Sequence, residues 1–105
     1  MLISTIDYIP GHEVSNVIDI ARGSTVRARN IGRDFLSGLK NLVGGEITAY
    51  TKLMADAREE ALFRMEEDAL DLGADAVINV RFMTSMVMQG CAEILAYGTA
   101  VKLKA

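Results

Sequence analysis

The sequence has few of the residues on which enzymes and disulfide-bonded proteins depend. It contains one cysteine, one histidine, one proline and no tryptophan, and only 6% of its residues are aromatic. Cys91 alone cannot form an internal disulfide, and His12, predicted to lie at the surface beside Pro10-Gly11, has no neighbouring nucleophile to activate. There is also no phosphate-binding loop and no pair of zinc-type metal ligands. We therefore expect that the protein is not an enzyme.

Long apolar runs and targeting signals are also missing. No segment approaches the roughly 20 apolar residues that a membrane-spanning helix needs, so we expect no membrane partner. Residues 1–7 lack the basic start and the cleavage site of a secretory signal. A lone cysteine suits a reducing compartment. Together these features predict a cytoplasmic protein.

The chain is acidic overall, with a net charge of −3, and its charge is unevenly distributed. Residues 46–72 alone carry eight acids against three bases. Arg27, Arg29 and Arg33 could bind an anion near the start of a helix, or they could pair with this acidic segment. Because no aromatic residues alternate with these arginines, we expect no nucleic-acid partner.

At 105 residues the chain is long enough for a single domain, residues 1–105, with a single core. Half of its residues, 50%, are hydrophobic and only 24% are charged, and the mean hydropathy is positive. This is more apolar material than a small monomer easily buries. We therefore expect a homo-oligomer whose subunit contacts hide the surplus.

The spacing of hydrophobic residues predicts an α+β fold, in which an antiparallel sheet packs on one long helix and a short helix is added. Strands are expected over residues 2–6 and 12–28. In the second strand the apolar residues fall at even positions, and Gly23 is expected to mark a bulge or a bend. The short helix is predicted over residues 30–43.

The long helix is predicted over residues 46–72, with Gly73 as the left-handed residue that ends it. Its apolar stripe recurs at steps of three and four residues and should face the sheet. The stripe consists of Ile47, Tyr50, Met54, Ala57, Ala61, Met65, Ala69 and Leu72. The acidic residues Glu66, Glu67 and Asp68 are expected to be solvated, because consecutive helix residues point in different directions.

A β-hairpin is predicted at the end of the chain, with strands over residues 76–88 and 91–103 joined by Gln89-Gly90. A regular two-residue turn pairs Met88 with Cys91, Met86 with Glu93, Phe82 with Tyr97, Val80 with Thr99 and Ile78 with Val101. In this register the bulky face takes the helix, and the small-residue face, which includes Gly98, contacts another subunit. A longer loop would shift this pairing.

Four short motifs, in order along the chain, resemble those of the YbjQ-like family. They are residues 43–46 (Val-Gly-Gly-Glu), 56–61 (Asp-Ala-Arg-Glu-Glu-Ala), 72–77 (Leu-Gly-Ala-Asp-Ala-Val) and 97–102 (Tyr-Gly-Thr-Ala-Val-Lys), and residues 28–34 are similar to a further signature. The resemblance implies a dodecin-like subunit assembled into rings, typically pentamers. The family is described as heavy-metal-binding, and no established activity follows from the resemblance. Residues 78–83 (Ile-Asn-Val-Arg-Phe-Met) replace an acidic strand of many members, which weakens any metal role that rests on that strand.

The candidate metal ligands in the residues themselves are sulfur atoms at the hairpin tip. Thioether and thiolate groups select Cu(I) and other soft ions. In the predicted register Met86, Met88 and Cys91 share one face and form the candidate site, whereas Met83 points away. The alternative, which the sequence favours, is that these methionines fill a core and that Cys91 is an inert small hydrophobic residue. No other cofactor is indicated.

Two functions remain open at this point. The first is an oligomeric cytosolic binding module of unknown activity, which takes a small ligand or a heavy-metal ion. The second is a purely structural or interaction protein that forms a ring without a small-molecule ligand.

Overall fold

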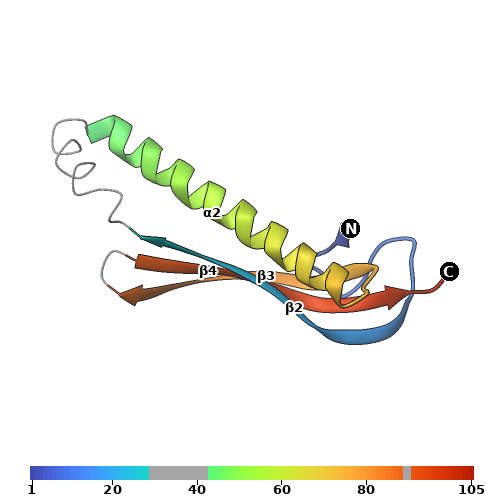
Figure 1. Ribbon diagram of the computed structural model, residues 1–105. Coiled ribbons are helices and arrows are strands. Elements are labelled where there is room, and N and C mark those ends of the chain that lie inside the picture. The colour runs from blue at the N-terminus through green and yellow to red at the C-terminus, as the bar shows by residue number, and fades with distance from the viewer. Residues whose placement is uncertain (29–42, 89–90) are drawn as a thin grey trace.

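The computed structural model describes residues 1–28, 43–88 and 91–105. One long helix lies along one side of a four-stranded sheet (Figure 1). The elements are β1 (Leu2–Ile3), β2 (Val14–Ala28), α2 (Val43–Asp71), β3 (Ala76–Met88) and β4 (Cys91–Leu103), and the strand order in the sheet is β1-β3-β4-β2. Apart from its last residue, the short helix predicted over residues 30–43 lies outside the described residues. No helix of the described part is long and apolar enough to cross a membrane.

The long helix and its end are confirmed. Helix α2 contains 29 residues, and Gly73, which follows it closely, has a left-handed backbone with φ of 80°. The Gly73 N–H donates to the Leu70 carbonyl at 3.0 Å, and the Ala74 N–H donates to the Ala69 carbonyl at 3.0 Å. These two bonds form a Schellman motif, which satisfies carbonyl groups that the helix leaves unpaired.

The sheet is mixed, so the prediction of a wholly antiparallel sheet is wrong in one respect. Strands β2, β4 and β3 are antiparallel to their neighbours, whereas β1 runs parallel to β3. Residues 4–13 cross from one edge of the sheet to the other instead of turning back along β1. On the way, Ile9 packs with Ile78 and Val101 and covers one end of the sheet.

The strand limits of the hairpin are confirmed, and so is the pairing of Met88 with Cys91. The other predicted pairs are wrong, because the register shifts between Met86 and Met88 and again between Ile78 and Arg81. Each shift is a β-bulge with an extra residue on β3, and the second contains Asn79 at φ of 53°. The structure pairs Met86 with Ala92, Phe82 with Ala96, Ile78 with Thr99 and Ala76 with Val101.

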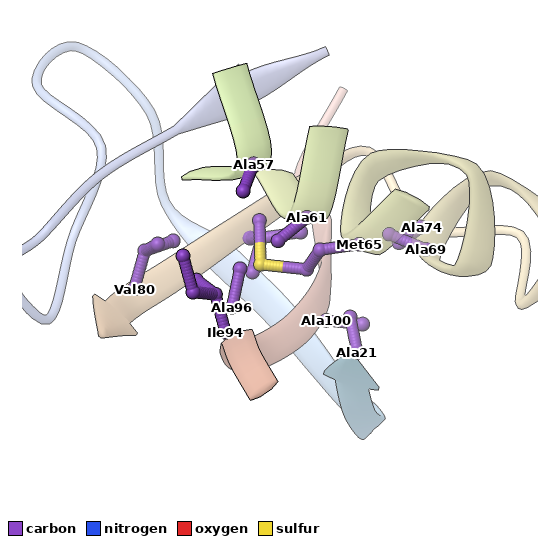
Figure 2. Packing of buried hydrophobic residues seen from close by; sticks show 11 residues of the cluster. Ala21, Ala57, Ala61, Met65, Ala69, Ala74, Val80, Ile94, Ala96 and Ala100 are labelled. Carbon is purple, nitrogen blue, oxygen red and sulfur yellow. The ribbon is translucent and has the colours of Figure 1, made fainter. Parts of the chain in front are cut away.

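The apolar stripe of α2 faces the sheet as predicted, but it packs on the small-residue side. The buried helix residues are Ala57, Ala61, Met65 and Ala69, and the buried sheet residues opposite them are Ala21, Val77, Val80, Ile94, Ala96 and Ala100 (Figure 2). We call this side of the sheet the helix face. Gly98 lies on it and is buried, where a Cβ atom would be 2.6 Å from Val77 Cγ1. The prediction that this side contacts another subunit is therefore wrong.

Gly23 lets the helix backbone touch the sheet. In this part of β2 the buried positions are Ala21, Gly23 and Thr25, which are odd, whereas most of the apolar residues of the strand fall at even positions. Gly23 pairs in register with Ala96 and marks no bulge, since the register shifts of β2 lie within residues 14–19. A Cβ atom on Gly23 would overlap the backbone of α2 and lie 2.6 Å from the carbonyl carbon of Arg64.

We predict that Gly23→Ala lowers the free energy of unfolding by roughly 3 kcal/mol, because the added methyl group forces the helix away from the sheet. The matched control is Ser24→Ala at the next position, whose side chain lies on the opposite side of the sheet; it should change stability by less than about 0.5 kcal/mol. Urea denaturation followed by circular dichroism measures both. Equal stability of the two variants would contradict the role of Gly23.

Candidate functional site

The side of the sheet that faces away from α2 carries apolar residues without a cover. Because side chains alternate along a strand, this open face is formed by Ile20, Arg22, Ser24 and Val26 of β2, Arg81, Met83 and Ser85 of β3, and Cys91, Glu93, Leu95, Tyr97 and Thr99 of β4. Ile20, Val26 and Met83 are 55%, 54% and 51% exposed. Exposed apolar residues that gather on one face, here interspersed with polar ones, are typical of an interaction surface.

A positively charged row crosses the open face. Arg22 of β2 and Arg81 of β3 both lie opposite Tyr97 of β4. Arg81 Nη1 donates hydrogen bonds to the carbonyl oxygen of Thr5 at 2.7 Å and to that of Val80 at 2.9 Å. Within the described ranges neither arginine forms an ion pair. The row therefore presents uncompensated positive charge beside the apolar residues.

The structure separates the sulfur atoms that were predicted to lie together. Cys91 lies opposite Met88, but Met86 lies opposite Ala92, the next residue of β4, so Met86 and Cys91 belong to different faces. Met86 is 76% exposed and Cys91 is half-buried. The side chain of Met88 lies outside the described part. Metal binding by Met86, Met88 and Cys91 stays a prediction, with a changed geometry.

Helix α2 closes the outer edge of β2. Asp68 Oδ2 accepts a hydrogen bond from the Arg22 backbone N–H at 3.0 Å, and Arg64 Nη1 donates to the Ser24 carbonyl at 2.6 Å. The buried Thr25 hydroxyl donates to the Ala57 carbonyl at 3.1 Å. The bonds to the Arg22 N–H and the Ser24 carbonyl satisfy backbone groups that an edge strand leaves unpaired. The prediction of a solvated acidic face is therefore wrong for Asp68, which points to the sheet, whereas Glu67 is exposed as expected.

The remaining candidates do not gather into a site. His12 is exposed, as predicted. Arg29 and Arg33 lie outside the described residues, and so does the side chain of Arg27. In the described parts of the chain, no three His, Cys, Asp or Glu side chains come together in a way that could hold a metal ion.

The motif at residues 72–77 has a structural role that sequence analysis missed. The Asp75 N–H donates to the Val101 carbonyl at 2.9 Å, and Asp75 Oδ2 accepts a hydrogen bond from the Leu103 N–H at 2.9 Å. Asp75 Oδ1 also lies 3.5 Å from Lys102 Nζ. The hydrogen bond from Leu103 and the positive charge of Lys102 lower the pKa of Asp75. Asp75 thus ties the end of the helix to the end of β4, next to the buried Ala76 and Val77.

With this geometry established, comparison with known proteins identifies the family. Residues 1–104 match the YbjQ_1 family model, which is described as "Putative heavy-metal-binding". A UPF0145 protein of Methanosarcina acetivorans is 59% identical over 103 residues, which cover 98% of this chain and 97% of that protein. A UPF0145 protein of Thermus thermophilus is 52% identical, with coverage of 99% and 91%. The chain therefore belongs to this YbjQ-like, or UPF0145, family.

A solved structure shares the fold. It is the crystal structure of a protein of unknown function from Pediococcus pentosaceus that belongs to the DUF74 family. The superposition has a TM-score of 0.65 and covers 99% of this chain and 98% of that one, at 18% sequence identity. At this identity the likeness extends to the arrangement of helix and sheet and to no particular activity.

The lowered pKa of Asp75 predicts a pH-dependent contribution to stability. The contribution is fully present above the carboxyl pKa of the unfolded chain and is lost as the pH falls through the lower pKa of the folded state. We expect Asp75→Ala to melt at a lower temperature than the wild type at neutral pH, and this gap to narrow on acidification. The melting temperature of Asp75→Asn should fall less than that of Asp75→Ala, because asparagine keeps an acceptor for the Leu103 N–H. Thermal melts at several pH values measure the difference in melting temperature between the wild type and each variant. A difference for Asp75→Ala that does not vary with pH would contradict the prediction.

Proposed function

We propose that this protein is the subunit of a cytoplasmic homo-oligomer that acts as a binding module for a small ligand or a heavy-metal ion, and not as an enzyme. The family resemblance supports a pentameric ring of dodecin-like subunits, each completed by a short helix over residues 30–43. The acidic chain has no nucleic-acid partner in this proposal. The alternative is a ring with a purely structural role.

The observation that carries the proposal is the open face. The radius of gyration is 17.3 Å and the extents are 57 × 24 × 17 Å, whereas a compact chain of this length has a radius of gyration of about 13 Å. Helix α2 lies mainly over β2 and β4 (Figure 1). The described part of the chain is thus one helix on one sheet, with a sheet face that carries exposed apolar residues turned to water. Burial of that face by another subunit would be favourable, at about 25 cal/mol per Å² of apolar surface.

Repetition around a ring supports the binding role. In a cyclic assembly each copy presents the same residues at equivalent places, so that Arg22, Tyr97 and Arg81 recur next to the subunit contacts. Pockets with a few convergent polar groups form preferentially at such boundaries. The structural alternative needs the same contacts but no ligand. A thermal-shift screen of small anions and metal ions separates the two, because only a binding module is stabilised by its ligand.

We predict that the wild type is a stable oligomer at low micromolar concentration and that Val26→Glu converts it to the monomer of 11.4 kDa. A carboxylate at this position of the open face lies opposite Glu93 and would be buried without a partner in the contact. Val26→Thr is the matched control, since threonine keeps the branched shape and strand preference without the charge. Native mass spectrometry measures the three masses, and a monomeric wild type would refute the proposed assembly.

For the hairpin tip we predict no stoichiometric Cu(I) uptake in competition with a chelator. The register leaves Cys91 with Met88 as its only sulfur partner among the three candidate residues, because Met86 lies on the other face. Soft-ion sites in proteins depend on several sulfur or imidazole ligands. Tight binding of about one ion per chain would reverse this prediction. If Cys91→Ser then abolished that binding and Met86→Leu did not, the ligand class would be a soft metal.

A further inference from the structure

A second exposed apolar surface lies on α2, on the side away from the sheet. We call it the outer ridge: it consists of Phe63 and Leu70, flanked by Glu59, Glu66 and Glu67. Phe63 and Leu70 are 59% and 62% exposed. They are seven residues apart, which is about two helical turns, so they share one side of the helix. The buried stripe, which includes Ala61 and Met65, lies on the opposite side.

The outer ridge is negatively charged. Glu59, Glu66 and Glu67 each lie three or four residues from Phe63 or Leu70, which makes them neighbours on the helix surface. In the described part of the chain these three carboxylates form no ion pair. Glu60 differs, since its Oε1 lies 2.7 Å from Arg64 Nη2. The ridge thus combines an apolar line with uncompensated acids, whereas the open face combines apolar residues with uncompensated arginines.

We infer that the outer ridge of one copy packs on the open face of the next copy. This inference rests on the proposed homo-oligomer and names the two surfaces that meet in it. The dimensions agree: Phe63 and Leu70 are separated by about 10 Å along the helix, and Ile20 and Val26 by about 20 Å along β2. The ridge is shorter than this span of the open face, which also contains Arg22, so its carboxylates can lie near Arg22 and Arg81.

Charge argues against the two symmetric alternatives. Each open face carries two arginines, Arg22 and Arg81, and one carboxylate, Glu93, so two open faces packed together would bring net positive charge against net positive charge. Two outer ridges packed together would bring their acids close to one another. Like charges placed across an interface are strongly unfavourable. A contact between ridge and open face is heterologous, because each copy uses a different surface toward each neighbour. Contacts of this kind close into a ring when the rotation per subunit fits, which agrees with the proposed assembly.

Two variants that each block one surface provide the test. Phe63→Ser/Leu70→Ser removes the ridge, and Val26→Glu blocks the open face. By native mass spectrometry each variant alone should be a monomer, and their equimolar mixture should contain a two-chain complex. In that complex the intact open face of the first variant binds the intact ridge of the second, and both remaining surfaces are blocked. If open faces packed together instead, the ridge variant would stay assembled with itself and the mixture would hold no complex that contains one copy of each variant, which would overturn the inference.

Reversed charges provide a second readout that needs no apolar substitution. Arg22→Glu and Glu66→Arg should each raise the concentration at which the oligomer dissociates by at least tenfold, and their combination in one chain should restore the wild-type value. Met86→Ser, at an exposed residue outside both surfaces, is the control and should leave the mass unchanged. Absence of rescue would overturn the inference. A monomeric wild type would refute the proposed assembly itself. If the wild type is an oligomer and the ridge variant keeps the same oligomeric mass, only this contact is refuted.

Discussion

The contact between the backbone of α2 and strand β2 at Gly23 is the constraint on which the rest of this structure depends. A helix normally lies against a sheet at a distance set by the side chains between them. Here a glycine in β2 and alanines in the buried stripe of α2 remove most of that spacing, so that Asp68 and Arg64 can reach the β2 backbone and the Thr25 hydroxyl can reach a helix carbonyl. The layer between helix and sheet is consequently thin, with Met65 as its largest fully buried side chain.

A thin inner layer determines what the outer surface looks like. Since Ala21, Ala96, Gly98 and Ala100 occupy the helix face, the larger apolar residues of the same strands alternate to the other side. Ile20 and Val26 of β2 are exposed there for this reason. The apolar surplus visible in the composition is therefore a consequence of tight packing elsewhere, and it lies on a surface that a second chain can reach.

Much of the fold could be predicted from the sequence, because some of its signals are local. The limits of the hairpin strands, the buried stripe of α2 and the terminating role of Gly73 follow from periodicity and turn chemistry, and the structure confirms them. The faces of the sheet could not be predicted, since two bulges in β3 change the register and a one-residue slip exchanges the faces. Nothing in the run around Asn79 signals a bulge before its φ is known. Gly98 was assigned to a subunit contact for another reason, because the bulkier face of the hairpin was expected to take the helix. The helix packs on the small-residue face instead, and Gly98 is buried beside Val77.

The bonds that α2 makes to the edge of β2 also limit how this protein can aggregate. A sheet with two free edges can add strands on both sides without end, which is the geometry of a growing fibre. In this chain a strand cannot pair along β2 at Arg22 and Ser24 without first displacing Asp68 and Arg64. Within the described residues β3 has no partner strand on its outer side beyond the short β1. Two chains that pair through their β3 edges use the same edge of both molecules, so that such pairing ends at two chains as long as Asp68 and Arg64 keep their bonds to β2.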